Sequence, residues 1–436
     1  MKHSFRFMGF LGICFLLLTI SGCNNSTQAS APKEKKLVIW HWMNDRQAAF
    51  NTLAQKYKAE TGVTIEFKLF FPPDIYSQKV IAAARAGSLP EIFGILGEKS
   101  TMGSFIKAKH IADLTPYMEK DGASWKNSFY PQALDVNVFT TANTYGVIPG
   151  IYGVPIDTTI MGFVASKALL QKAGLDPNKL PGTFDEFVRE AKTVQEKTGK
   201  NGFVCGWGEG WLVNCMATEW AINLMGEDKF IKTIKGEVPY TDKDWLEVFT
   251  LFVKLKDAGI LNANITTMIN KESEDAFSKE QAAFSFNGSW SVNVYKQLNP
   301  DLEYSFFALP KISNNFPVKL WGGAGSSFMV NNTSPLKEEA VNFLKWITAK
   351  NQQDFLIIET NNLPSIKGCE KTLPPILSEL NSRMGQLTHP NIWPCNEDSR
   401  VLEIMNQNLQ QIVMGVKKPR DAAKEIQEVK ERVKKQ

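Results

Sequence analysis

Tryptophans beside glycine or small polar residues are the feature of this chain with the clearest chemical potential. A flat indole ring can stack on the apolar face of a ligand, and glycine neighbours let the backbone bend and approach that ligand closely. The tryptophans in this setting are Trp40, Trp42, Trp207, Trp211, Trp290, Trp321 and Trp393. Each could instead pack in a core. Trp125, Trp220, Trp245 and Trp346 occur at helical spacing or in a hydrophilic loop, and we interpret these four as structural.

Carboxylates near aromatic rings would serve a glycosidase as well as a binding protein, because glycoside hydrolysis needs a pair of carboxyl groups. Glu98 and Glu209 are the candidate pair. The chain has no G-x-S-x-G, H-E-x-x-H or P-loop pattern. Beyond the N-terminal segment its histidines are His41, His110 and His389, which form no evident metal triad. We therefore expect no catalytic residues, metal, cofactor or nucleotide site.

The N-terminus predicts export and a lipid anchor. Lys2 and Arg6 precede the apolar run 7–20, which is too short for a bilayer span of about 20 residues but suits a signal peptide. Small residues lead into Cys23, as a lipoprotein signal peptidase requires. We expect residues 1–22 to be a lipoprotein signal peptide, Cys23 to be lipidated and 23–35 to be a flexible tether. The protein would then be anchored to the cell membrane on its extracytoplasmic face, at the cell surface or in a periplasm. An ordinary signal peptide with a nearby cysteine is the alternative.

Cysteine use and charge are consistent with this location. Beyond Cys23 the chain has Cys205, Cys215, Cys369 and Cys395, and the shortest loops favour disulfides 205–215 and 369–395 in an oxidising compartment. A zinc site is the alternative, although the spacings do not resemble a C-x2–4-C knuckle. The formal charge of +4 falls to +2 without Lys2 and Arg6, so no strong field attracts nucleic acid. Glu and Lys at i,i+4 spacing in KEIQEVKERVKKQ predict a solvated C-terminal helix.

Hydrophobic periodicity predicts an α/β fold. The first section alternates as β-α-β-α-β, with strands at 37–43, 63–70 and 92–96 and helices at 45–60 and 75–86. This order is typical of a mostly parallel sheet with helices on both faces. Ligands lie beyond the carboxyl ends of such strands, which directs attention to 40–44 and 97–99. Further helices are predicted at 167–174, 183–198, 215–225, 242–258 and 271–280, and further strands at 282–290, 304–310 and 327–331.

Several sequence blocks, in a consistent order, resemble those of a known family. They include LVIWHWMNDRQAAFNTLAQKYKAETGVTIEFK, GSLPEIFGILGEKS, YGVPIDTTIMGFVASKALLQKAGLDPNKLPGTFDEFVREAKTV, DAFSKEQAAFSFNGSW and WGGAGSSFMVNNTSPLKEEAVNFLKWITAKNQQDFLIIETNNLPSIKG. Together they resemble the extracellular solute-binding proteins (family 1) of ABC importers, in particular the sugar-binding branch that includes maltose-binding protein. The resemblance covers essentially the whole chain after the tether.

The resemblance implies a fold and a function. The fold would be a two-lobed α/β clamp of the periplasmic-binding-protein class II type, whose discontinuous lobes are joined by hinge crossings. The lobes would be 36–146 plus 310–360 and 147–309 plus 361–436. The protein would be a monomer that captures a mono- or oligosaccharide in the interlobe cleft and delivers it to ABC transporter permease subunits. The alternatives are a binder of an organic anion, phosphorylated polyol or peptide, and a secreted lipid-anchored glycoside hydrolase. Lys99 and Arg46 would favour an anion.

The resemblance also implies binding residues. A family block that supplies an acidic and a basic side chain to sugar hydroxyls aligns with Glu91 and with Glu98-Lys99, Trp290 matches a stacking tryptophan, and Trp393 falls near another. The ligand carboxylate of the interlobe strand is replaced around 157–159, which puts maltose itself in doubt. Tyr152 and Glu209 are added from their loop positions. The expected ligand-binding residues are Trp40, His41, Trp42, Asn44, Glu98, Lys99, Tyr152, Glu209, Trp211, Trp290, Trp321 and Trp393.

Overall fold

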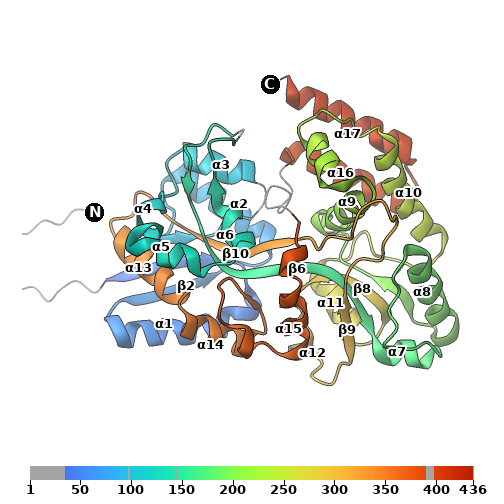
Figure 1. Ribbon diagram of the computed structural model, residues 1–436, viewed down its shortest axis with the longest axis horizontal. Helices are drawn as coiled ribbons and strands as arrows, with labels where there is room; N and C mark the ends of the chain where they lie inside the picture. The colour runs from blue at the N-terminus through green and yellow to red at the C-terminus, as the bar shows by residue number, and fades with distance from the viewer. Residues whose placement is uncertain (1–34, 97–98, 144, 389–396, 436) are drawn as a thin grey trace, which may run out of the picture. The chain divides into compact units, whose positions relative to one another are not determined.

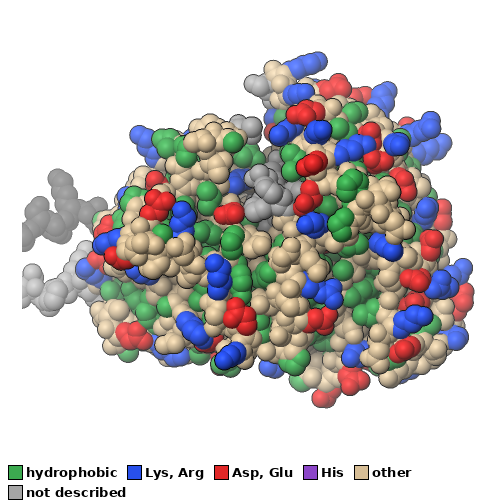
Figure 2. Space-filling view, in the orientation of Figure 1, with side chains coloured by type: hydrophobic (Ala, Val, Ile, Leu, Met, Phe, Trp, Pro, Cys, Tyr) green, Lys and Arg blue, Asp and Glu red, His purple; other side chains and the backbone are tan. Residues whose placement is uncertain are grey.

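The computed structural model describes residues 35–96, 99–143, 145–388 and 397–435. The predicted signal peptide, Cys23 and almost all of the tether lie outside these residues. The chain from Lys35 onward forms one compact unit. Within the described ranges no helix is both long and apolar enough to cross a membrane, and no three His, Cys, Asp or Glu side chains are grouped so as to hold a metal ion. Lysine and arginine side chains are interspersed with acidic ones over the face in Figure 2.

The first section folds as its periodicity predicts. β1 (Lys36–His41), α1 (Gln47–Thr61), β2 (Thr64–Leu69), α2 (Pro73–Ala86) and β3 (Ile92–Phe93) follow in order, and β1 pairs in parallel with β2 and β3. Gly62 ends α1 in the left-handed conformation, at φ 74°, which glycine adopts without strain. Side chains along β1 alternate between buried and less buried positions, so one face of the strand packs in the core.

The complete sheet is more mixed than the predicted parallel one. Its strand order is β2-β1-β3-β10-β6-β8-β7, and β9 and β11 also pair with β6. β10 (Gly322–Val330) runs antiparallel to β3 and to β6 (Val154–Ser166). β8 (Ala282–Gly288) and β9 (Tyr304–Phe307) are antiparallel to β6, whereas β7 (Asn201–Val204) is parallel to β8. The prediction of a mostly parallel sheet therefore holds for β1 to β3 and for β7 with β8.

Two strands cross from one hydrophobic core to another, which gives the two-lobed fold that the resemblance implies. Figure 1 shows β6 running across the middle of the described body. Val154 and Ile156, early in β6, pack with the core around Leu37 and Phe50, whereas Phe163 packs with the core around Trp220. β10 runs beside β6. β11 (Leu363–Pro364) adds a further connection by pairing with Asp157 and Thr158.

The helices surround these strands (Figure 1). In the first lobe, besides α1 and α2, they are α3 (Lys99–Lys107), α4 (Thr115–Met118), α5 (Lys120–Ser128), α6 (Pro131–Leu134), α13 (Lys337–Ile347) and α14 (Lys350–Thr360). In the second they are α7 (Lys167–Lys172), α8 (Phe184–Thr198), α9 (Gly210–Ile234), α10 (Lys243–Asp257), α11 (Asn270–Ser278), α12 (Ser291–Leu298), α15 (Pro375–Ser382), α16 (Ser399–Val413) and α17 (Pro419–Lys434). Short elements are η1 (Asn44–Arg46), η2 (Asp135–Asn137), η3 (Glu370–Thr372), η4 (Met384–Gln386), β4 (Val138–Phe139) and β5 (Gly150–Ile151). The predicted helices are confirmed, although α9 begins at Gly210 rather than at 215 and extends to Ile234.

The structure corrects the disulfide prediction. Cys205 is a free thiol whose Sγ donates to the carbonyl of Phe286 at 3.4 Å, and no disulfide joins it to Cys215. Both side chains are buried in the core of the second lobe, where a cysteine packs as a small apolar residue. Cys369 is also a free thiol, and its predicted partner Cys395 lies outside the described residues.

The C-terminal helix is less solvated than its charge pattern predicts. Lys430 of α17 is 7% exposed, and its Nζ donates to both carboxylate oxygens of Glu397 at 2.6 and 2.8 Å. The Tyr240 hydroxyl donates to the same carboxylate at 2.8 Å. The helix therefore docks on the second lobe through a buried ion pair, which a local i,i+4 pattern does not reveal.

Candidate functional site

A glycine-rich loop in the second lobe positions the first candidate residues. Gly206 and Gly208 lie between β7 and α9 and press against the segment 267–270. A Cβ at Gly206 would lie 2.4 Å from the Cα of Asn270, and one at Gly208 would lie 2.7 Å from the Met268 carbonyl oxygen. Only glycine allows two backbones to approach this closely. The close approach brings Glu209, which follows the loop, beside Asn270.

Glu209 and Glu274 each accept a hydrogen bond from an indole N–H. Trp211 Nε1 donates to Glu209 Oε2 at 2.9 Å, and Trp290 Nε1 donates to Glu274 Oε1 at 3.1 Å. Asn270 joins the two pairs, because its backbone N–H donates to Glu209 Oε1 at 2.9 Å and its Nδ2 donates to Glu274 Oε1 at 3.1 Å. These five residues form one continuous network, which we call the indole–carboxylate network.

The two indole rings of this network lie beside each other. Their centroids are 6.0 Å apart and their planes are inclined by 49°. Trp290 is partly exposed and its ring covers Gly288, where a Cβ would lie 1.8 Å from Trp290 Cζ3. Trp211 is 38% exposed. One face of Trp290 is therefore occupied by the protein backbone, and the pair leaves aromatic surface available to a ligand.

The carboxylate of Glu274 lies in a desolvated position. Glu274 is 3% exposed, and burial raises its pKa above the ordinary value. Hydrogen bonds from Trp290 and from Asn287 Nδ2 (3.2 Å), together with the charge of Lys271, act in the opposite direction. The charge of Asp45 raises the pKa of Glu274 further, which places this first-lobe carboxylate within electrostatic range of the network.

Asp45 connects the first lobe to the second. It lies in η1, directly after β1, and its Oδ2 accepts a hydrogen bond from Asn293 Nδ2 of α12 at 3.2 Å. The Asp45 side chain is 13% exposed and Asn293 is 2% exposed. The candidate site thus combines residues at the end of β1 with residues around the end of β8.

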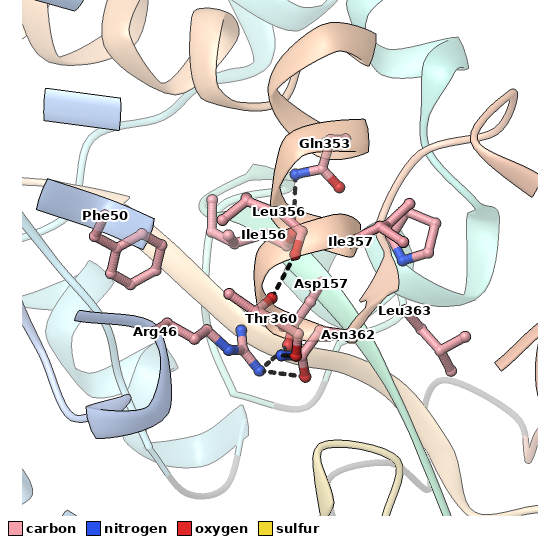
Figure 3. Close-up of a pocket in the computed structure, with 11 residues that line it drawn as sticks. Arg46, Phe50, Ile156, Asp157, Gln353, Leu356, Ile357, Thr360, Asn362 and Leu363 are labelled. Atoms are coloured by element: carbon pink, nitrogen blue, oxygen red, sulfur yellow. Dashed lines mark hydrogen bonds and ion pairs between the residues drawn. The ribbon is translucent and has the colours of Figure 1, made fainter. Parts of the chain in front are cut away.

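Arg46 fixes this end of β1 to the crossing strands (Figure 3). Its Nη2 lies 2.5 Å from Asp157 Oδ2 of β6 and donates to Asn362 Oδ1 at 2.9 Å. Asp157 Oδ1 also accepts the backbone N–H of Ser326 in β10 at 2.6 Å. The adjoining cavity of about 10 Å³ has room for no more than about one water molecule. This cluster is therefore structural rather than a ligand pocket.

Trp40, Trp42 and Asn44 keep exposed surface at the end of β1. The Trp40 ring packs edge-on against Phe70 at 5.0 Å, with Lys79 Nζ 4.9 Å from its centroid. Trp42 covers Gly94, where a Cβ would lie 2.4 Å from Trp42 Cζ3. Of the other predicted residues, Glu98 and Trp393 lie outside the described residues.

Four predicted binding residues are buried in the structure. His41 is 0% exposed on the core face of β1, where its Nε2 is 2.9 Å from Gln47 Oε1. Burial lowers its pKa to about 4. The Tyr152 hydroxyl donates to the Ile148 carbonyl at 2.9 Å, and Trp321 packs in the core of the second lobe.

Lys99 is the fourth of these residues. Its Nζ lies 3.4 Å from the Asp135 carbonyl oxygen and 5.1 Å from the Phe139 ring centroid, and burial lowers its pKa to about 8. Trp207, one of the tryptophans that lie beside glycine in the sequence, is also fully buried.

Sequence reasoning missed Asp45, Asn270, Glu274 and Asn293. Asp45 lies one residue beyond the stretch that the strand-end rule selected, so that rule could have found it. Glu274 belongs to NKESEDAFS, a helix whose composition suggests a solvated surface. Its burial depends on contact with β8, which is distant in sequence.

The strands that cross between two cores, and the polar and aromatic side chains gathered where the lobes meet, define a two-lobed solute-binding protein. The sequence comparison agrees: residues 41–354 match the family described as bacterial extracellular solute-binding protein. The chain belongs to this family.

Individual relatives have low sequence identity to this chain, but the matches cover most of its length. The chain is 24% identical to the multiple sugar-binding protein of Streptococcus mutans over 357 residues, covering 79% of each chain. It is 26% identical to the lactose-binding protein of Rhizobium radiobacter over 345 residues, covering 76% of this chain and 74% of the relative. A solved chitin oligosaccharide binding protein superposes with a TM-score of 0.78 at 21% identity, covering 92% of this chain and 98% of that one. This structure shares the fold.

Proposed function

We propose that this protein is the carbohydrate-binding component of an ABC importer. It would capture a mono- or oligosaccharide between its lobes and deliver it to membrane permease subunits. The observation that carries the proposal is the indole–carboxylate network, which offers indole surface in the second lobe, together with Asp45 of the first lobe, which accepts a hydrogen bond from Asn293 of the second. Sugars have apolar C–H faces that stack on aromatic rings and hydroxyls that pair with polar groups. The names of the two sequence relatives point to the same ligand class.

The mechanism contains no chemical step. Ligand that contacts Asp45 from one side and Trp290 from the other would stabilise the arrangement in which the two lobes approach. Such a population shift requires that the ligand bind this arrangement more tightly than a more open one. Sequestered ligand would then pass to the permease, and ATP hydrolysis would be carried out by separate subunits.

The binding residues that we propose are those with available surface at this junction. They are Trp40, Trp42, Asn44, Asp45, Glu209, Trp211 and Trp290, with Glu98 and Trp393 retained from the sequence resemblance. His41, Lys99, Tyr152 and Trp321 are omitted because they are buried. Arg46 is committed to Asp157 and Asn362, and Lys99 is desolvated. Neither residue therefore favours the anion-binding alternative.

We propose lobes of 36–146 plus 310–360 and 147–309 plus 361–436, adjusted where the cores change. Ile156 belongs to the core around Leu37 and Phe50, whereas Ile160 belongs to a separate cluster that includes Val204 and Tyr295, so the first boundary moves into β6. Leu320 and Phe328 belong to different cores, so the second boundary moves to the beginning of β10.

We also propose that Cys23 carries a lipid that keeps the protein at the extracytoplasmic face of the membrane. The support is the apolar run followed by small residues and Cys23. Intact-mass measurement of protein purified from a bacterial membrane would show a diacylglyceryl increment, and Cys23→Ser would remove it. A mass that matches a chain cleaved elsewhere would contradict the anchor.

Binding of purified protein to a saccharide panel tests the proposed function. The panel includes glucose, maltose, xylobiose, chitobiose and lactose, with polyols, phosphosugars, amino acids and peptides as comparison ligands. A saturable change in tryptophan fluorescence and a thermal shift with one saccharide are expected. Trp290→Ala should abolish the response and Trp290→Phe should restore part of it. Responses confined to a non-saccharide would overturn the carbohydrate assignment, and consumption of the sugar would indicate a hydrolase.

A further inference from the structure

We propose that this chain has a second binding site, distinct from the indole–carboxylate network, for a small organic carboxylate with an apolar body. The site is a solvent-open hollow of about 280 Å³ that is lined by α12, β9, α15 and Asn361 at the end of α14. Pockets for small molecules range upward from about 300 Å³, so the hollow suits a ligand at the small end of that range. The existence of this site does not depend on the proposed carbohydrate function.

The hollow has an apolar wall that could cover the body of a ligand. Figure 1 shows α12 and α15 on one side of β6 and α9 on the other. Val292 of α12, Leu302 before β9 and Ile376 of α15 line the hollow. Val292 and Leu302 belong to the buried cluster around Tyr295, and Ile376 packs against that cluster. Contact with this wall would remove apolar ligand surface from water, which is favourable.

Three polar side chains line the same hollow without a hydrogen-bond or ion-pair partner elsewhere in the described part of the chain. They are Lys296 of α12, Tyr304 of β9 and Asn361. Asn361 is only 7% exposed, and a buried amide without a partner is costly. Asn299 also lines the hollow, but its Nδ2 donates to the Ser278 carbonyl at 2.8 Å. The first three groups are therefore available to a ligand.

The helix end explains the backbone of Asn361 but not its side chain. Asn361 ends α14 in the left-handed conformation, at φ 45°, and its backbone N–H donates to the Ile357 carbonyl. Glycine serves equally well at such a helix end. The amide of Asn361 is therefore not required by the cap, and a ligand would give it a hydrogen-bond partner.

The polar groups favour a carboxylate. Among the described residues that line the hollow, Lys296 is the one charged side chain. Burial raises the pKa of Tyr304 above its ordinary value, so its hydroxyl remains protonated and can donate. The amide of Asn361 is a further donor. A carboxylate has two oxygens and about four acceptor positions, so it can use all three groups.

The position of the hollow predicts coupling to the junction of the lobes. α12 lines the hollow and also carries Asn293, which donates to first-lobe Asp45 at 3.2 Å. Asn361 directly precedes Asn362, whose Oδ1 accepts from Arg46 Nη2 at 2.9 Å. A ligand that contacts α12 and Asn361 together therefore contacts two elements that attach one lobe to the other. If it favours one arrangement of the lobes, it changes the affinity of the site between them.

Saturation-transfer NMR titration of the purified protein tests the site. The probes are benzoate and 4-methylpentanoate, with benzamide as a neutral control of similar shape and inorganic phosphate as an anion without an apolar body. We expect saturable binding of both carboxylates, and binding of benzamide and phosphate at least about five-fold weaker. Lys296→Met should weaken benzoate at least about five-fold. Lys424→Met, which removes an exposed lysine of α17, should leave the benzoate affinity unchanged.

Two substitutions at Asn361 separate its amide from its backbone role. Asn361→Gly keeps the left-handed helix end and should weaken benzoate about five-fold. Asn361→Asp introduces a carboxylate into the hollow and should abolish benzoate binding. Tyr304→Phe should weaken benzoate about as much as Asn361→Gly does. Circular dichroism checks that each variant is folded.

The outcomes that overturn the site are specific. Absence of binding of benzoate and 4-methylpentanoate at millimolar concentrations would overturn it, as would benzoate binding that is unchanged in Lys296→Met and in Asn361→Asp. Phosphate that binds as tightly as benzoate would overturn the requirement for an apolar body.

Coupling between the two sites is tested by titrating the saccharide that gives the largest thermal shift, with and without saturating benzoate. We expect the saccharide affinity to change at least about five-fold, and the benzoate affinity to change by the same factor when saccharide is saturating. Unchanged affinities would overturn the coupling. Absence of saccharide binding would overturn the proposed function, whereas the carboxylate site would still be judged by the benzoate titration.

Discussion

On each side of the candidate site a tryptophan ring covers a glycine, but the two tryptophans have different surroundings and different roles. On the first-lobe side Trp42 covers Gly94 and packs against Tyr76, with ring centroids 5.0 Å apart. On the second-lobe side Trp290 covers Gly288, and its N–H is held by Glu274. The nearby charges differ as well, since Asp157 has a guanidinium partner at 2.5 Å, whereas Glu274 accepts from neutral donors and has Lys271 Nζ 3.7 Å away. The first side is built for attachment to the crossing strands, and the second presents an oriented aromatic surface.

Of the substitutions that compare the two sides, removal of Arg46 should cause the largest loss in the free energy of unfolding. Arg46→Met leaves Asp157 buried without its cation, and loss of one partner of a buried pair costs about 3–5 kcal/mol in the free energy of unfolding. Urea denaturation measures this loss. The matched control is Lys36→Met, which removes an exposed pair with Glu66 and should cost less than about 1 kcal/mol. Similar losses in the two variants would contradict a structural role for the Arg46 cluster.

The burial of His41, on the first-lobe side, predicts that this residue makes the free energy of unfolding depend on pH. Its folded-state pKa of about 4 is below the unfolded value of about 6.5, so the unfolded chain binds the proton more tightly. The stabilising contribution is complete above pH 6.5 and is lost as pH falls toward 4, by up to about 3 kcal/mol. Urea denaturation between pH 7 and pH 4.5 should show a smaller decline in His41→Gln. The control, His110→Gln, should decline as the wild type does, and a parallel decline in all three would refute this assignment.

Adding a methyl group under each tryptophan compares the two sides directly. Gly288→Ala should displace Trp290 and weaken saccharide binding about ten-fold. Gly94→Ala should displace Trp42 and lower stability by about 1–3 kcal/mol through overpacking, with a smaller effect on affinity. Gly385→Ala is the control, because its Cβ would meet no atom within 4 Å. If Gly94→Ala weakens binding as much as Gly288→Ala does, Trp42 contacts ligand as closely as Trp290, and the proposed contrast is wrong.

Local pattern predicted much of the fold and part of the site. The period of apolar residues was sufficient for β1, α1, β2 and α2 because each buries one face against a neighbour in sequence. The same local reasoning could not separate Trp290 from Trp321, since both lie beside glycine. Trp321 is buried because it packs in the core of the second lobe, where its backbone N–H donates to Glu219, a buried residue of α9 about a hundred positions away. Contacts of this range depend on the tertiary fold.

The alternation of side chains along β1 explains why His41 differs from its two tryptophan neighbours. The strand-end rule selected 40–44 correctly as a region, but side chains alternate along a strand. His41 therefore faces the core while Trp40 and Trp42 keep exposed surface. Glu274 was missed because the composition of its helix suggests a solvated surface. In the fold, β8 and the loop that carries Glu209 bury this helix face.

Hydrogen exchange of the purified protein, with and without the saccharide that gives the largest thermal shift, tests the central claim most directly. That claim is that ligand lies between the end of β1 and the indole–carboxylate network. We predict that saturating saccharide slows exchange in peptides covering 40–46 and also in peptides covering 206–211 and 270–293. Peptides of α17, which docks elsewhere on the second lobe, should be unaffected. Protection confined to one of the two sides, or located away from both, would contradict the account.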